Sequence, residues 1–307
     1  MSVRIIGKTN IDFIGLRKFA FVFSSILVLG GLYALVMMFA GKANMGIEFG
    51  GGTMVQGYFD RPVDVGKLRE AADKAGFTDA TIQELRRDIP NSFVIRTKSA
   101  PEKSVEKSAL IETALKTAFP DNAFHLDSVH EVGPAVGKTL QKQARLAVLI
   151  SMLGILIYVA ARFDFRFGVA ATVATLHDIL AALAIVYFLN WEISILVISA
   201  VLTLAGYSLT DTVVVFDRIR ENLRLMRRKA DFVPGVNLSI NAVLSRTILT
   251  SLTTLLAVVS ILVVGGEVLR DFAALLTMGI IIGTYSSVFV AAPIYVEWEN
   301  RRPKRFQ

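Results

Sequence analysis

Six long apolar segments dominate this sequence and limit what it can fold into. They cover residues 19–41, 140–161, 167–189, 193–216, 242–264 and 272–296. A helix of this length crosses about 30 Å of hydrocarbon, and 53% hydrophobic residues with a mean hydropathy of +0.55 place the chain outside the soluble class. We therefore expect a membrane α-helical bundle of six transmembrane helices, with the last five in residues 140–297. The first segment is longer than the apolar part of a signal peptide and is followed by Lys42 rather than a cleavage pattern, so we expect it to be retained.

The basic residues indicate which way the chain crosses the membrane. Lys and Arg gather before the first apolar segment and at residues 162–166, 218–229 and 301–305. The loops on the other side, 190–194 and 265–271, hold three acidic residues and one Arg. By the positive-inside rule, residues 1–18 and 298–307 face the cytoplasm of a bacterial inner membrane. The net charge of +7 is then explained by topology, and we expect no nucleic-acid partner.

Residues 42–139, between the first two apolar segments, read as a periplasmic domain. Runs typical of strands lie at 53–59, 80–86, 92–98 and 123–132. Helical patterns at 63–75 and 105–119 separate them. The resulting β-α-β-β-α-β order predicts an α+β ferredoxin-like domain.

Glycines mark both connections between this domain and the membrane. Gly50, Gly51 and Gly52 allow either plain flexibility or a specified turn, and we favour the turn because glycine permits positive φ. The stretch Gly133-Pro134-Ala-Val-Gly137 resembles a phosphate-binding loop, but it has three residues between the glycines where that motif needs four. We therefore interpret both stretches as hinges and expect no nucleotide or other cofactor.

Asp211 is the most informative single residue. It lies inside the fourth apolar segment, about 7.5 Å to the cytoplasmic side of its middle at about 1.5 Å per residue. A charge in hydrocarbon costs at least about 2.5 kcal/mol, so such a residue normally faces the bundle interior and marks an ion or proton pathway. The alternative is a single structural hydrogen bond. Arg246 enters the fifth segment at a matching depth and is the expected partner of Asp211.

The fifth segment carries two hydroxylated stripes at helical spacing. Arg246, Thr250 and Thr253 share one stripe, which we expect to serve proton coupling, and Thr247, Ser251 and Thr254 share the neighbouring one. These hydroxyls could carry water or could simply join helices by hydrogen bonds.

His177 and Asp178 are adjacent near the middle of the third segment. Adjacent helical residues point about 100° apart, so we expect one of them to face lipid or a neighbouring helix. A metal site would need further ligands, and we expect proton handling or interhelical bonding instead. Glycines at 206, 279 and 283 are expected to allow close helix packing. With no cysteine and no nucleophile–base pair at a shared depth, we expect no enzyme activity.

Several ordered stretches together closely resemble the SecD/SecF family, a branch of the resistance-nodulation-division (RND) superfamily. They are GIEFGGG at 46–52, VGPAVG at 132–137, YVAARF at 158–163, LHD at 176–178, GYSLTDTVVVFDRIREN at 206–222, SRT at 245–247, TSLTT at 250–254 and GTYSS at 283–287. The resemblance covers nearly the whole chain. The chain departs from the family pattern at Thr210, where members often have Asn, and at Glu48, where they often have Asp.

This resemblance implies a role in protein export driven by the proton-motive force. It implies pairing with SecD into a twelve-helix unit that docks on the SecYEG channel and helps to pull a preprotein outward, with YajC, YidC and membrane lipid as further expected partners. It also implies that Asp211 takes up and releases protons while Arg246 tunes it. The rival hypothesis is an RND-type transporter of small substrates or lipids, which usually carries two similar six-helix halves in one chain.

Overall fold

The computed structural model describes residues 9–78, 80–85, 89–98, 104–225 and 232–302. It contains six helical segments that are long and apolar enough to cross a membrane, as predicted. They are α1 (Arg17–Phe39), α5 (Pro134–Arg162), α6 (Phe165–Phe188), α7 (Ile195–Leu225), α8 (Phe232–Val264) and a sixth segment built from α9 (Gly266–Ser286), a π-helical turn (Ser287–Ala291) and α10 (Ala292–Arg301).

Several helices extend beyond the apolar segments. α5 begins at Pro134, which fits the first helical turn because its missing N–H needs no partner there. α7 and α8 continue past the apolar residues toward the end of the bundle that carries both chain termini. Charged side chains allow a helix to continue in water, as in the ion pair between Arg218 and Glu221 one turn apart on α7.

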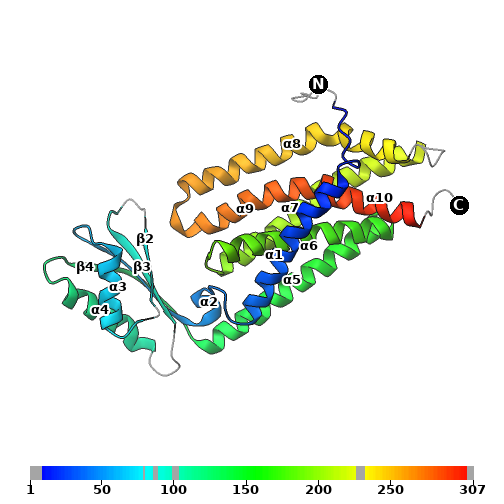
Figure 1. Cartoon of the computed structure of the whole chain (residues 1–307). Coiled ribbons are helices and arrows are strands. Elements are labelled where there is room, and N and C mark those ends of the chain that lie inside the picture. Colours follow the sequence, from blue (N-terminus) through cyan, green and yellow to red (C-terminus); the bar gives the residue numbers. More distant parts are fainter. Residues whose placement is uncertain (1–8, 79, 86–88, 99–103, 226–231, 303–307) are drawn as a thin grey trace.

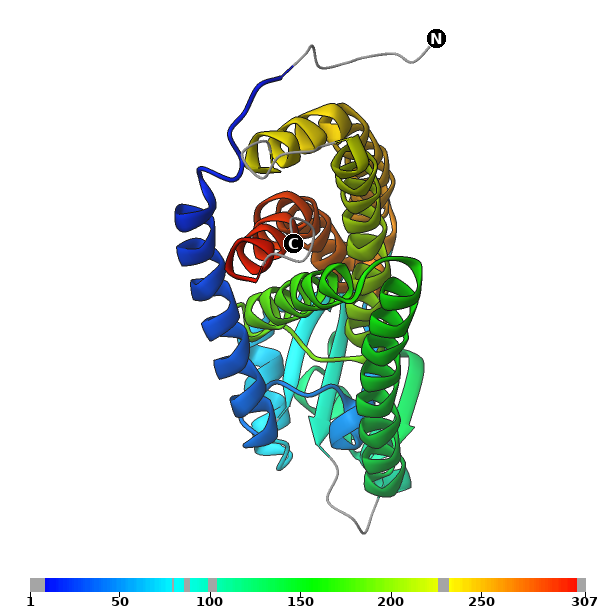
Figure 2. The same cartoon turned by 90° about the vertical axis from the view of Figure 1, so that its right-hand side faces the viewer.

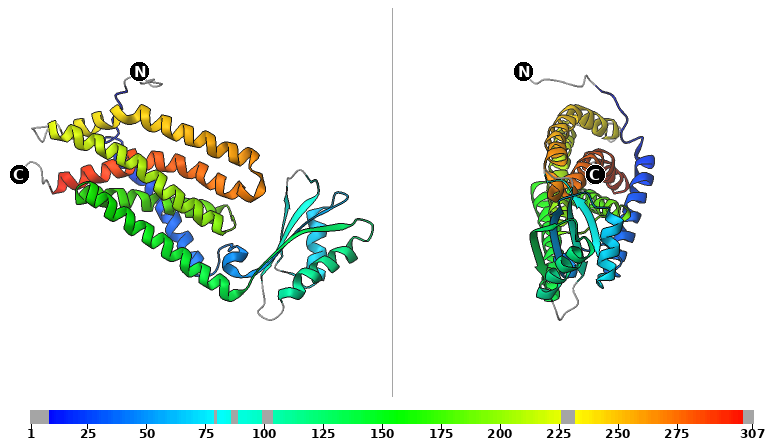
Figure 3. Two further views of the ribbon diagram at one scale, coloured as in Figure 1. Left: turned by 180° about the vertical axis from the view of Figure 1, so that it is seen from behind. Right: turned by 90° about the vertical axis from the view of Figure 1, so that its left-hand side faces the viewer.

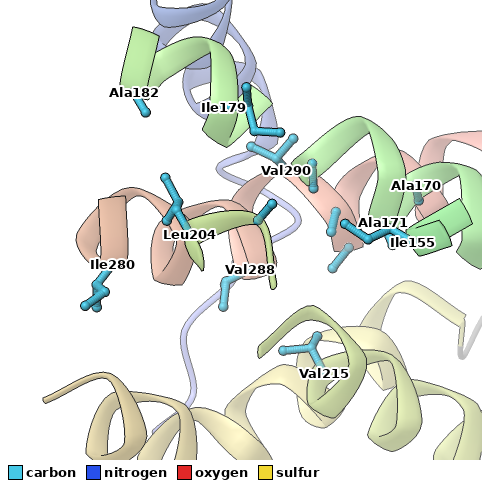
Figure 4. Packing of buried hydrophobic residues seen from close by; sticks show 14 of the residues in the cluster. Ile155, Ala170, Ala171, Ile179, Ala182, Leu204, Val215, Ile280, Val288 and Val290 are labelled. Carbon is cyan, nitrogen blue, oxygen red and sulfur yellow. The ribbon is translucent and has the colours of Figure 1, made fainter. Parts of the chain in front are cut away.

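The sixth segment is not the regular helix that its sequence suggests. Pro293 has no N–H to donate to the preceding turn, and the helix widens into the π-helical turn directly before it. The turn places Val288 and Val290 in the buried core that also holds Ile179 of α6 and Leu204 of α7 (Figure 4).

The sheet domain, residues 52–132, has the predicted ferredoxin-like order. Its strands are β1 (Gly52–Phe59), β2 (Thr81–Leu85), β3 (Ser92–Lys98) and β4 (Phe124–Val132), and its helices are α3 (Val65–Lys74) and α4 (Ser104–Ala118). The sheet is antiparallel in the order β2-β3-β1-β4. Leu68 of α3 and Leu115 of α4 are buried in one core with Val55 and Ile95 of the central strands. The last predicted residue of the second strand, 86, lies outside the described residues.

The sheet domain lies at one end of the helical bundle, and the start of α1 and the end of α10 lie at the other (Figure 1). A short helix, α2 (Ile47–Gly50), sits between sheet and bundle. Seen along the bundle, α1 and α5 flank α2 on opposite sides (Figure 2). Among the spanning helices, α6 is the most enclosed, because 72% of its most apolar stretch is buried inside the protein. Polar groups on α6 must therefore find partners inside the protein.

Candidate functional site

Asp211 on α7 is buried where three helices meet. Only 4% of the residue is exposed. The Ser251 hydroxyl on α8 donates a hydrogen bond to Asp211 Oδ2 at 3.2 Å, and Ser251 Oγ lies 2.7 Å from Thr284 Oγ1 on α9. A short hydroxyl chain therefore joins the carboxyl group to both neighbouring helices.

Arg246 does not make the direct contact with Asp211 that its depth suggests. The side chains form no ion pair within 4.0 Å, and Arg246 is exposed. Residues 246 and 251 on α8 point to different faces of the helix, and the face that meets α7 is the one with Thr247 and Ser251. A matching depth along two helices does not fix which face of its helix a residue occupies.

Thr250 and Thr253 likewise lie on the outward face of α8. Both are exposed, and the Thr250 hydroxyl donates to the carbonyl oxygens of Arg246 and Thr247 in its own helix. Thr250 and Arg246 nevertheless lie close enough to act on Asp211, so the role of this stripe in proton coupling stays a prediction.

A cavity of about 620 Å³ lies beside Arg246 at the end of the bundle that carries the termini. It reaches Val214, one turn after Asp211, and its wall includes Asp217 and Arg220. Asp217 pairs with Arg220 at 3.4 Å and with Arg162 of α5 at 3.3 Å. Water in this cavity would come within one helical turn of the buried carboxyl group.

A second buried carboxyl group, Asp178 on α6, is held from three helices. Its Oδ2 accepts hydrogen bonds from Ser208 of α7 and from Ser286 of α9, the latter at 2.7 Å. Its Oδ1 lies 2.8 Å from Nδ1 of His177. Of the two expected environments, lipid or a neighbouring helix, the structure shows the second for both residues, since His177 is 3% and Asp178 0% exposed. Other helices enclose most of the circumference of α6, so the side chains of both His177 and Asp178 point into the protein.

The glycine connections have the geometry of defined turns. Gly51 has φ +73°, a conformation that L side chains rarely adopt, and a Cβ there would lie 3.2 Å from Cα of Pro134. Gly133 caps α5, and a Cβ at Gly137 would lie 2.8 Å from the carbonyl oxygen of Phe49. The two connections therefore lie against each other, and their role as a hinge stays a prediction.

Two of the three predicted packing glycines are at helix contacts. A Cβ at Gly279 would lie 2.7 Å from the Leu204 side chain, and one at Gly283 would lie 3.2 Å from Cβ of Ser208. Gly206 is different, because nothing lies within 4 Å of its Cβ position and it is exposed. It faces outward on α7, like Thr210 one turn later.

The sequence pattern does not reveal Ser208 and Ser286 as hydrogen-bond donors to Asp178, nor Thr284 as a neighbour of Ser251. Their signal is weak, because a hydroxyl in an apolar helix is common and its partner lies on another helix. In the part of the chain that the structure describes, no group of three or more His, Cys, Asp or Glu could hold a metal ion.

A six-helix apolar bundle with buried carboxyl groups such as Asp178 and Asp211, and with an α+β domain at one end, defines a multi-pass membrane protein with a polar intramembrane site. The model of the family described as protein export membrane protein SecD/SecF, C-terminal, matches residues 111–301. The chain belongs to this family.

Individual relatives agree over nearly the full chain. It is 48% identical over 293 residues to the protein translocase subunit SecF of Thermodesulfovibrio yellowstonii, covering 95% of this chain and 96% of the relative. It is 40% identical to the same subunit of Calditerrivibrio nitroreducens, covering 93% of each.

Two solved structures share the fold. One is SecDF, a translocon-associated membrane protein from Thermus thermophilus, with a TM-score of 0.81 and 36% identity over 98% of this chain. The other is SecDF in a super-membrane-facing form, with a TM-score of 0.69 and 36% identity over 97%. This chain spans 40% of the length of each of those chains. Its conformation is closer to the first than to the second.

Proposed function

We propose that this chain is the SecF-type subunit of the bacterial protein-export machinery and uses the proton-motive force, together with SecD, to assist late translocation of preproteins through SecYEG. The observation that carries the proposal is the burial of Asp211 among hydroxyl groups of two other helices. A carboxyl group at this depth is costly, and intramembrane carboxyl groups mark proton pathways. The relatives are named as translocase subunits, which supports a transport component rather than an enzyme.

The proton acts by changing what Asp211 can bind. An ionised carboxylate only accepts hydrogen bonds, whereas a protonated carboxyl group also donates one. In this structure Asp211 accepts from Ser251, and Arg246 stands apart beside the cavity. Loss of the proton favours the approach of Arg246, and uptake releases it, so each proton alters the packing of α7 against α8. One proton crossing 100 mV supplies about 2.3 kcal/mol, enough to bias a two-state element.

The cavity beside Arg246 supplies a route for the proton to leave. In the proposed orientation both termini are cytoplasmic and the protein lies in the inner membrane. This cavity is at the same end of the bundle, so it opens to the cytoplasm. Its Arg and Asp side chains keep it polar. Protons then enter from the periplasmic side, and the glycine turns at Gly51 and Gly133 transmit repacking of the bundle to the sheet domain.

The outward faces of α7 and α8 are the proposed SecD contact. On α7 the exposed positions Thr203, Gly206 and Thr210 form a stripe of small residues, and on α8 the exposed Arg246 lies near the same depth as Asp211. Small residues let helices approach closely, and an Arg in a membrane needs protein or water around it. This chain spans 40% of the length of each solved SecDF chain, so the remainder of those chains is long enough to hold a second helical half that packs against these faces. SecYEG, YajC, YidC and the preprotein are proposed partners of the assembled unit.

Copurification tests this assignment against an RND-type transporter. With SecD coexpressed, the tagged chain should retain SecD and SecYEG, and Gly206→Leu should lose SecD because it fills the contact stripe. Gly154→Leu is the matched control, since Gly154 of α5 is also exposed with nothing within 4 Å of its Cβ position. Retention of neither partner by the wild-type chain would contradict the proposal. Equal retention by both variants would contradict the proposed contact face.

A further inference from the structure

The sheet domain is attached to the bundle by an ion pair across their junction. Arg96 of β3 places Nε 3.2 Å from Oε2 of Glu192, which lies in the loop between α6 and α7. Both side chains are largely buried, at 23% and 19% exposed. The pair borders a cavity of about 150 Å³ that is lined by residues of the strands, of α2 and of the bundle. Figure 3 shows α2 between the sheet and the bundle.

A second carboxyl group lies beside Glu192. Glu48 of α2 has a buried Oε2 that meets no hydrogen-bond donor among the described residues. A Cβ added at Gly46 would lie 2.5 Å from this atom and 3.2 Å from Oε1 of Glu192. The two carboxyl groups thus share the space that glycine leaves open at position 46.

The charged groups that face Glu192 come from three elements. They are Arg96 from β3, Glu48 from α2 and Asp271 from α9, which all line the cavity. Arg270, next to Asp271, does not line it. With every group ionised, three carboxylates and one guanidinium share a space from which most water is excluded, an arrangement that disfavours full ionisation.

We propose that Glu192 is a proton-binding site on the periplasmic side of the membrane, separate from Asp211, and that its proton fastens the sheet domain to the bundle. The step adds one proton to one carboxylate oxygen of Glu192. The neutral carboxyl group gains an O–H that can donate to Oε2 of Glu48, the buried acceptor that has no donor among the described residues.

The direction of the effect follows from proton linkage. Burial raises the pKa of Glu192 above its ordinary value of 4.5; Arg96 opposes this rise, Glu48 and Asp271 add to it, and a backbone hydrogen bond from Ile47 opposes it. An undocked Glu192 in water would have the ordinary pKa, so the docked state binds the proton more tightly. Docking is therefore favoured below the raised pKa and weakens as the pH rises through it. This inference goes beyond the proposed function, because it concerns the position of the sheet domain and not export.

Spin labels can follow the docking directly, because the chain has no cysteine of its own. Labels at Thr117→Cys on α4 and Ser260→Cys on α8, both exposed, report the distance between sheet domain and bundle in the full chain with SecD in lipid nanodiscs. The ratio of docked to undocked protein should rise on acidification, by up to about tenfold per pH unit. Glu192→Gln should stay docked at every pH. Arg96→Gln should undock more readily at alkaline pH and dock again in acid.

Glu84→Gln is the matched control, because Glu84 on β2 is exposed and does not line the cavity. It should keep the wild-type pH response. A wild-type distance distribution that does not change with pH would overturn the proposal, and so would a Glu192→Gln variant that keeps the pH response. Export activity is not part of this measurement, so failure here is distinguishable from failure of the proposed function.

Discussion

Ser251 on α8, and not Arg246, is the residue that contacts the buried Asp211. The hydroxyl donates to Oδ2 of Asp211 at 3.2 Å, while Arg246 lies on the outward face of the same helix, beside the cavity at the end of the bundle. The structure therefore shows Asp211 bound by hydroxyl groups with the guanidinium withdrawn. In the mechanism proposed above, this arrangement corresponds to the protonated state.

Removing the Ser251 hydroxyl should affect both stability and export. Ser251→Ala should lower the free energy of unfolding by about 0.6 kcal/mol, the average for interhelical hydrogen bonds in membranes, and should slow gradient-dependent export. Ser260→Ala on the same helix is the control, because the Ser260 hydroxyl bonds to the carbonyl oxygen of Leu256 in its own helix. Unfolding titrations and export assays in vesicles measure the two effects. Indistinguishable results for the two variants would show that Ser251 does not support Asp211.

Loss of the Asp178 carboxyl group should destabilise the bundle. Asp178→Ala leaves the hydroxyls of Ser208 and Ser286 and the ring of His177 without their shared partner, and we expect a loss of about 1–3 kcal/mol. Asp164→Ala is the control on the same helix, since Asp164 makes no side-chain cap hydrogen bond. Thermal unfolding in detergent measures the difference.

A conservative substitution distinguishes a structural role of Asp178 from a role in proton transfer. Asp178→Asn keeps one acceptor oxygen but cannot ionise. If Asp178 carries protons, this variant should fold nearly normally and export slowly. Normal export by a stable Asp178→Asn variant would assign Asp178 a purely structural role.

Packing of α1 on α6 should depend on a single glycine. A Cβ at Gly31 would lie 2.2 Å from the carbonyl oxygen of Leu180, and backbone at that distance cannot move aside without shifting a helix. Gly31→Ala should therefore destabilise the protein by about 1–3 kcal/mol. Gly30→Ala is a matched control with the same gain in helix propensity, because its Cβ would meet the Phe188 side chain at an ordinary 3.4 Å. Equal unfolding free energies for the two variants would contradict this close contact between α1 and α6.

Much of the fold could be predicted from the sequence because its signals are local. Apolar length identifies the spanning helices, and alternation identifies the strands of the sheet domain, down to the turn before Ser92. The π-helical turn could not be predicted, since Pro293 signals a disturbance but not its form.

The site was harder to predict, because its geometry depends on helix rotation. The depths of Asp211 and Arg246 follow from counting residues, but which α8 stripe meets α7 is decided by packing between helices. For the same reason the sequence left open whether His177 or Asp178 faces lipid or a neighbouring helix, and the structure places both inside the bundle, 2.8 Å apart. Gly206 carried the same small-residue signal as Gly279, yet only Gly279 has a helix against it within this chain.

The central claim is that Asp211 couples the proton gradient to export, and one comparison tests it most directly. Export into inverted membrane vesicles is measured for the wild type and for Asp211→Asn, with and without a protonophore. Asp164→Asn is the control and should respond like the wild type, because Asp164 is exposed at the start of α6 and does not line the cavity beside Arg246. We predict that collapsing the gradient slows export by the wild type, and that Asp211→Asn exports at this slow rate whether or not the gradient is present. Full gradient-dependent export by Asp211→Asn would contradict the proposed mechanism.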